Sequence, residues 1–220
     1  MNLGTAADAV ILSVTGLNPS DDTNVDKSYV MYLLAQVRDA SVKGYLDKAI
    51  QAGLPIDSQY IVRETCKVLS IEDEDCVDEE DERIYVTLEK RPLDIIRDMG
   101  VVEVTTDEKI SVLKAQMQNI TMFRDLRFSK PSANNLVYYR HDKKIVIEGL
   151  SSKNLKGDEF IVDYVPALAS EALVATDELL VSDALLPTVV DTVTKMLMEQ
   201  LGMPQDVEND GVPPSQQQKQ

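Results

Sequence analysis

Apolar residues return every three or four positions over about residues 24–52, which is the spacing of one face of an α-helix. Asn24 or Asp26 can cap the start of this helix, because a short side-chain oxygen accepts hydrogen bonds from its free N–H groups. Gly53-Leu54-Pro55 ends the pattern. The sequence therefore predicts a long helix near the start of the chain, with an apolar stripe that is typical of packing.

A second helical pattern covers about residues 183–201. Pro187 lies in its first turn, where a missing N–H costs little, and Gly202-Met203-Pro204 ends it. A shorter helix is predicted over about residues 107–122, between two strand-like segments. The chain is thus expected to have three helices, of which the two long ones lie toward opposite ends.

The middle of the chain is rich in β-branched residues and favours strands. Predicted strands cover about residues 59–71, 83–88, 101–105, 136–140, 144–148 and 159–165. The strands predicted over residues 136–140 and 144–148 are separated only by His141-Asp142-Lys143. So short a connection predicts a β-hairpin.

The order helix, strands, helix, strands, helix predicts an α+β fold, with long N-terminal and C-terminal helices packed together and a β-rich middle over about residues 59–165. Residues 24–204 would form this one domain. Residues 1–23 are small, apolar and broken by turn-forming residues, which predicts an N-terminal arm without a long helix of its own. Residues 205–220 predict a polar C-terminal tail.

The charge of the chain limits its function. It has 22 Lys and Arg against 38 Asp and Glu, a formal net charge of −16. Independent binding of nucleic acid is not expected, because most of that affinity comes from Lys and Arg side chains that neutralise phosphates. The few aromatic residues, with no Trp, also argue against base stacking. An acidic wall past which DNA slides without sticking remains compatible with this charge.

Two features indicate assembly in a reducing cytoplasm. Cys66 and Cys76 are too few for a typical secreted disulfide fold, so both are expected to be free thiols. The N-terminus lacks the basic start of a signal peptide, and the apolar run Ala9-Val10-Ile11-Leu12 is too short to span a bilayer. No membrane partner is predicted.

Residues 72–82 carry nine carboxylates in eleven positions and are the obvious candidate for a metal site. An EF-hand loop needs a Gly at its sixth position, yet no Gly occurs between Gly53 and Gly100. A solvated loop kept open by self-repulsion is the favoured interpretation, with adventitious binding of divalent cations as the alternative. No metal ligands are assigned.

Catalytic chemistry also lacks candidates. His141 is the only histidine, and a predicted hairpin turn is a poor place for a shielded base. The nine glycines are scattered and form no phosphate-binding loop. The sequence therefore predicts a protein that is not an enzyme, with no catalytic, cofactor-binding or metal-binding residues and no cofactor.

The remaining clusters are small. The basic groups, Lys90 with Arg91 and Arg124 with Arg127 and Lys130, are expected to form salt bridges with neighbouring acidic surfaces. The methionines at the end of the last helix fill the core or form an adaptable contact surface; they are Met196, Met198 and Met203.

Several short segments together resemble the ring proteins in the tails of crAss-like phages. At the start they are residues 2–10, Pro19-Ser20-Asp21-Asp22, Tyr32-Leu33-Leu34 and Arg38. Further on they are Arg127-Phe128, residues 134–138, residues 186–191, residues 203–206 and Asn209-Asp210-Gly211. The resemblance spans most of the chain, and none of its segments is a catalytic signature.

The resemblance implies a structural virion protein of the tail and portal vertex, assembled in the host cytoplasm. It implies a homo-oligomeric ring, twelve-fold to match the portal, which lines the DNA exit channel without sequence-specific binding. The portal and other tail ring proteins would be its partners. Residues 72–82 have no counterpart in this family pattern.

Two other functions fit parts of the sequence. A metal-dependent carboxylate hydrolase would require turnover that depends on divalent metal and on residues 72–82. An acidic cytosolic interaction module would remain monomeric, with flexible ends.

Overall fold

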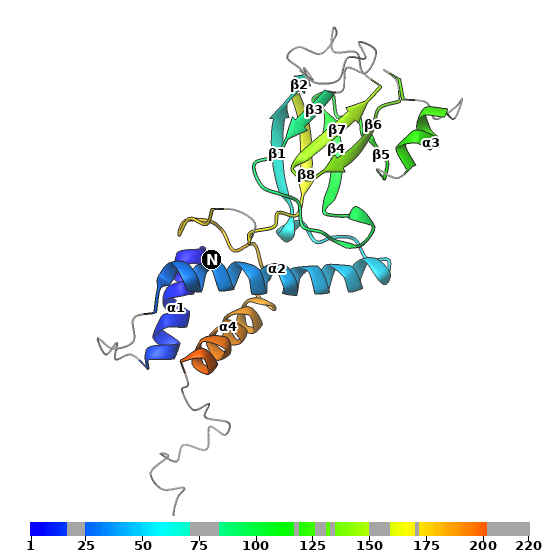
Figure 1. The fold of residues 1–220 in the computed structure, drawn as a ribbon. Coiled ribbons are helices and arrows are strands. Elements are labelled where there is room, and N and C mark those ends of the chain that lie inside the picture. The colour runs from blue at the N-terminus through cyan, green and yellow to red at the C-terminus, as the bar shows by residue number, and fades with distance from the viewer. Residues whose placement is uncertain are drawn as a thin grey trace, which may run out of the picture.

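Figure 1 shows a computed structural model of the chain, with the longer helices gathered at one end and the β-strands, with a short helix beside them, at the other. The structure describes residues 1–16, 25–70, 84–116, 119–125, 131–132, 135–149, 159–169 and 172–201. Within these ranges, no helix is both long enough and apolar enough to cross a membrane.

The described residues form the helices α1 (Leu3–Thr15), α2 (Lys27–Gln51), α3 (Ile120–Asp125) and α4 (Leu186–Gln200), and the 3₁₀ turns η1 (Ser58–Tyr60) and η2 (Ile96–Asp98). The two predicted long helices are confirmed as α2 and α4. Asp26 caps α2 by accepting from the Ser28 N–H at 2.9 Å. Gly53, just beyond α2, has the left-handed φ of 75° that ends helices.

The prediction that residues 1–23 carry no long helix is wrong, because α1 spans 13 of them. Asn2 caps α1 by accepting from the Thr5 N–H at 2.8 Å. The buried residues of α1 include Leu3, Ala6, Ala7, Val10 and Val14, which is helical spacing built largely from small residues. The breaker residues 18–22 lie outside the described residues.

The strands form two sheets. The three-stranded sheet has the order β1 (Val62–Lys67), β8 (Glu159–Tyr164) and β4 (Val101–Thr106), all antiparallel. The five-stranded sheet has the order β2 (Leu69–Ser70), β3 (Ile84–Thr87), β7 (Lys144–Glu148), β6 (Val137–His141) and β5 (Leu113–Lys114). Phe160 and Val162 of one sheet share a hydrophobic cluster with Ile145 and Ile147 of the other, so the sheets pack together as a sandwich.

Most predicted strands are confirmed, and so is the hairpin, since β6 and β7 pair antiparallel with His141 opposite Lys144. The prediction of a helix over residues 107–122 is wrong. There the chain crosses from one sheet to the other: the Val112 N–H donates to Val104 at 2.8 Å, and the Leu113 N–H donates to Leu136 at 2.9 Å. Pairing with two strands satisfies backbone groups that a helix would have satisfied locally.

α2 lies between the sheets on one side and α4 on the other, and α1 crosses one end of α2 (Figure 1). One face of α2 contributes Val30 and Leu34 to a cluster that also contains residues of α1 and α4. Farther along, Val42 and Leu46 pack with residues at the lower end of the sheets, among them Val165. The α+β class is confirmed, with helices at both ends of the chain and a β-rich middle.

Candidate functional site

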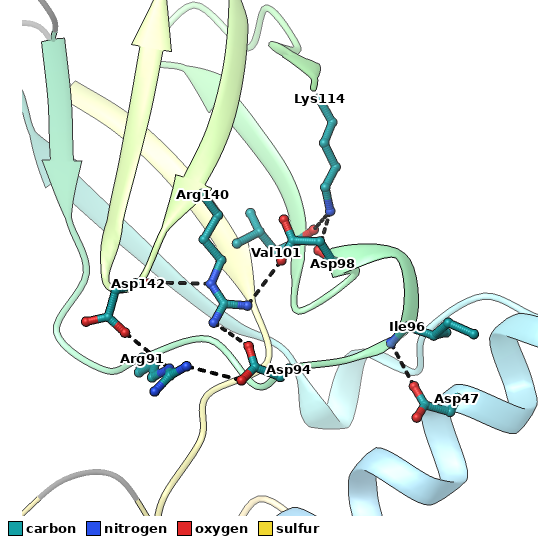
Figure 2. A network of polar contacts seen from close by, with 9 residues as sticks. All are labelled: Asp47, Arg91, Asp94, Ile96, Asp98, Val101, Lys114, Arg140 and Asp142. Atoms are coloured by element: carbon teal, nitrogen blue, oxygen red, sulfur yellow. Dashed lines mark hydrogen bonds and ion pairs between the residues drawn. The ribbon is translucent and has the colours of Figure 1, made fainter. Parts of the chain in front are cut away.

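A network of polar contacts lies where the sheets meet α2, around the segment between β3 and β4 (Figure 2). This segment contains η2 and is anchored to the helix side by one bond, in which the Ile96 N–H donates to Asp47 Oδ1 at 2.8 Å. Its other anchors come from the sheets.

Arg140, at the end of β6, is the centre of this network, and its side chain is only 6% exposed. Its Nη2 lies 2.7 Å from Asp94 Oδ1, and its Nη1 lies 3.2 Å from Asp98 Oδ1. Its Nε donates to the Asp142 carbonyl at 3.1 Å. Arg91 also pairs with Asp94, at 3.1 Å, and with the Asp142 carboxylate, at 3.2 Å. The hairpin turn is thus fixed to the segment that faces α2.

Lys114 of β5 holds the other side of the segment. Its Nζ donates to the Asp98 carbonyl and, at 3.1 Å, to the Val101 carbonyl. Burial lowers the pKa of the Lys114 ammonium, and the nearby Asp98 carboxylate opposes this shift.

These anchors hold an unusual backbone. Arg97 and Asp98 are consecutive non-glycine residues with left-handed φ values of 57° and 56°, a conformation that costs about 1–2 kcal/mol for each residue. Gly100 lets the segment fold back closely, since a Cβ there would lie 2.0 Å from the Leu93 carbonyl oxygen. The segment is therefore a rigid junction between the two halves of the protein.

A hollow of about 520 Å³ beside the junction is lined by three arginines, three aspartates and a glutamine; they are Arg91, Asp94, Arg97, Asp98, Gln116, Arg140 and Asp142. The charges balance, and these residues include no thiol, hydroxyl or imidazole that could act as a nucleophile. Among the residues that the structure describes, no group of three or more His, Cys, Asp or Glu side chains could hold a metal ion. The ion pairs among these residues hold the segment between β3 and β4 against the sheets, which is a mechanical role.

A second buried network centres on Arg38 of α2, which is fully buried. It donates to the carbonyls of Pro166 at 2.7 Å, Leu180 at 2.9 Å and Leu179 at 3.1 Å, and to Asp39 at 2.8 Å. Burial lowers the pKa of its guanidinium, while Asp39 opposes the shift.

Asp39 extends this clamp by accepting from the backbone N–H groups of Leu168 at 3.1 Å and Ala169 at 2.9 Å. The pair thus binds the segment that leads from β8 toward α4. This role was not predicted from the sequence, although Arg38 stands four residues after Leu34 and four before Val42, both buried on α2. A charged residue in an apolar stripe is the signal that could have revealed it.

The start of the chain binds the same segment. The Leu3 N–H donates to Asp177 and the Gly4 N–H to Ala175, both at 2.8 Å, while Met1 accepts from Leu179 at 3.1 Å. A Cβ at Gly4 would lie 2.9 Å from Ala175, so only glycine permits this approach.

Comparison with known families agrees with the mechanical character of these networks. The profile of a family described as phage tail ring protein 2 matches residues 5–216, nearly the whole chain. This chain belongs to the phage tail ring protein 2 family. The resemblance to ring proteins of crAss-like phages is thereby confirmed, and the coarse function is a structural one in a virion tail. No curated protein matches the chain.

In this tail ring protein, the residues singled out as possible chemistry lie apart. His141 is exposed at the end of β6. Cys66 is a free, buried thiol in β1. Burial raises its pKa to about 12, with Glu64 adding to the shift. Residues 72–82, including Cys76, lie outside the described residues.

The prediction of salt bridges is confirmed for three of the basic residues. Lys90 pairs with Asp177 at 3.4 Å, and Arg124 pairs with Glu148 at 2.6 Å; Arg91 belongs to the junction. Arg127 and Lys130 lie outside the described residues. The methionines divide between the two interpretations, since Met198 packs against the helical core and Met196 is 41% exposed. Met203 also lies outside the described residues.

Proposed function

We propose that this protein is one subunit of a closed twelve-fold ring in the portal–tail assembly of a phage. The ring would line the DNA exit channel and dock the portal and neighbouring tail proteins. The observation that carries this proposal is the family match over residues 5–216. The protein would act in the virion as a structural part without catalytic activity.

The charge supports a place beside the DNA channel. A net charge of −16 for each subunit repels phosphate, so DNA can pass a wall of such subunits without binding to it. A basic lining would instead retain the DNA.

The two buried networks support a role that requires a stiff subunit. Arg140 bonds to a residue more than 40 positions away in sequence, and Arg38 bonds to one more than 120 positions away. These bonds resist separation of the helical end from the sandwich. A subunit under pressure from passing DNA would need this stiffness.

The mode of assembly follows from symmetry and charge. A head-to-tail contact closes into a ring when two different surfaces of the subunit are complementary. Self-repulsion of strongly acidic subunits opposes that closure in solution, so isolated subunits are expected to stay largely monomeric at low salt. Rings would close only on the portal or on a neighbouring ring, with residues 205–220 acting as an interface arm.

Native mass spectrometry of the isolated subunit, followed by cryo-electron microscopy of the subunit bound to its portal, tests this proposal. We expect a monomer alone and twelve-fold added density on the portal. A stable isolated dimer, or a portal without added density, would refute it.

A further inference from the structure

An uncharged apolar patch is exposed along the seam between α2 and α4. It consists of two tyrosines of α2, one methionine of α4 and the residue that follows α4, and each is 40–44% exposed; they are Tyr29, Tyr32, Met196 and Leu201. We call it the seam patch. Single exposed apolar residues are ordinary, whereas several on adjoining helices mark a candidate contact surface.

Hydrogen bonds place these residues together. Tyr29 Oη and the Gln200 side-chain amide bond to each other, with Oη lying 3.2 Å from Oε1 and 3.1 Å from Nε2. Tyr32 lies three residues after Tyr29, and Met196 lies four before Gln200, so each shares a helix face with its neighbour. Tyr29 lies near the start of α2 and Gln200 is the last residue of α4, so their hydrogen bond joins these two helix ends.

The chemistry of the seam patch selects a neutral, apolar ligand. Gln36 Nε2 donates to Tyr32 Oη at 2.6 Å, so both tyrosine hydroxyls have partners and their ring surfaces remain available. The two lysines beside these residues in sequence are paired, Lys27 with Asp8 at 2.6 Å and Lys195 with Asp191 at 2.9 Å. Aromatic side chains on a protein surface are a recurring binding site for proline-rich segments, which are rigid before binding and lose little entropy.

The chain itself contains one matching segment. Val212-Pro213-Pro214 is its only pair of adjacent prolines, and it lies eleven residues beyond Leu201, where the seam patch ends. Eleven extended residues reach about 35 Å, enough to leave one subunit and meet another. A closed ring needs two different complementary surfaces on each subunit, and a proline segment with a tyrosine seam is such a pair.

We propose that Val212-Pro213-Pro214 of one subunit docks on the seam patch of a second copy. The inference rests on the proposed function, because it names a contact within the ring. Tyr29 and Tyr32 hold the prolines, and Met196 adapts to them.

The test is fluorescence anisotropy with a labelled peptide of residues 205–220, titrated with the dilute full-length protein. We expect saturable binding of this peptide, and we expect Tyr32→Ala in the protein to weaken it by about tenfold or more. A peptide with both prolines changed to Ser should not bind. Ile110→Ala, which alters an exposed residue of the sandwich, should bind as the wild type does. Absence of saturable binding, or binding insensitive to Tyr32→Ala, would overturn the proposal.

A second variant determines whose tail occupies the patch. A full-length chain with Pro213→Ser and Pro214→Ser cannot cover its own seam patch. Equal binding of the peptide by this variant and by the wild type supports docking on a second copy. Clearly weaker binding by the wild type would show that its own tail competes, at a high effective concentration, and would overturn the proposal.

Portal imaging separates this inference from the proposed function. If the subunit forms rings on the portal but does not bind the peptide, only the seam contact is wrong. If it binds the peptide but adds no density to the portal, the ring function is wrong.

Discussion

Arg38 Nη1 donates to the carbonyl oxygen of Pro166 at 2.7 Å, across 128 positions of sequence. One fully buried side chain of α2 thereby binds the segment that leaves the sheets. Its removal would leave that carbonyl and those of Leu179 and Leu180 without this donor. The Asp39 carboxylate would keep its two backbone donors but lose its ion-pair partner.

We therefore expect Arg38→Met to lower the free energy of unfolding by about 3–5 kcal/mol, because three carbonyls lose a buried donor and the partly buried Asp39 carboxylate loses its cation. Urea unfolding measures this. Lys43→Met, on an exposed position of the same helix, is the control and should change the free energy by less than about 0.5 kcal/mol. Equal stability of the two variants would contradict a clamp at Arg38.

At the junction, Arg140→Gln should lower the free energy of unfolding by about 1–3 kcal/mol, since Asp98 and the Asp142 carbonyl lose a well-buried donor. Asp94→Asn should cost less than about 1 kcal/mol, because Asp94 is 63% exposed and solvent screens its pairs. Thermal or urea unfolding of both variants checks this order. A larger loss from Asp94→Asn would mean that Asp94, rather than Arg140, holds the junction.

Cys66 gives the folded protein a dependence on alkaline pH. Burial raises its pKa from 9.0 to about 12, so above pH 9 the unfolded thiol ionises while the folded one keeps its proton. This stabilisation is complete below pH 9 and is lost as pH rises toward 12, by at most about 1.4 kcal/mol for each pH unit. Two variants are compared, Cys76→Ser alone and Cys76→Ser with Cys66→Ala. Between about pH 8 and 10.5, the free energy of unfolding should fall more steeply in the variant that keeps Cys66. The same pH dependence in both variants would show that folding does not raise the pKa of the Cys66 thiol.

Deletion of residues 205–220 should leave the melting temperature of the isolated subunit within about 2 °C of the wild-type value. Assembly on the portal should be impaired, because polar segments of this kind gain order by binding a neighbour. A full-length chain with Gln216, Gln217 and Gln218 changed to Ser is the matched control and should assemble. Normal assembly of the truncated chain would argue against an interface arm.

Isothermal calorimetry with calcium and with magnesium should detect at most weak binding, because residues 72–82 lack the glycine turn of a calcium loop. Repeating it with Glu79→Gln and Glu80→Gln attributes any binding to this segment. A stoichiometric site of sub-micromolar affinity, lost in that variant, would contradict the prediction and revive the metal-dependent alternative.

Local signals in the sequence determined the elements whose backbone hydrogen bonds are made within the element or with the next strand. The Asp26 cap, the stripe through Leu34 and Val42, and Pro187 in the first turn specify α2 and α4. Only a short turn separates β6 from β7, so the pairing of these two strands with each other was predictable as well. The net charge, which depends on composition alone, already argued against independent binding of nucleic acid.

Tertiary structure alone decided where the distant partners lie. The predicted strand over residues 59–71 divides, because β1 pairs with β8 whereas β2 pairs with β3 of the other sheet. Leu113 and its neighbours become a crossing between sheets, and Arg38 becomes a clamp. The physical reason is that periodicity records which face of an element is buried. It does not record which backbone group, often far away in the sequence, completes a hydrogen bond.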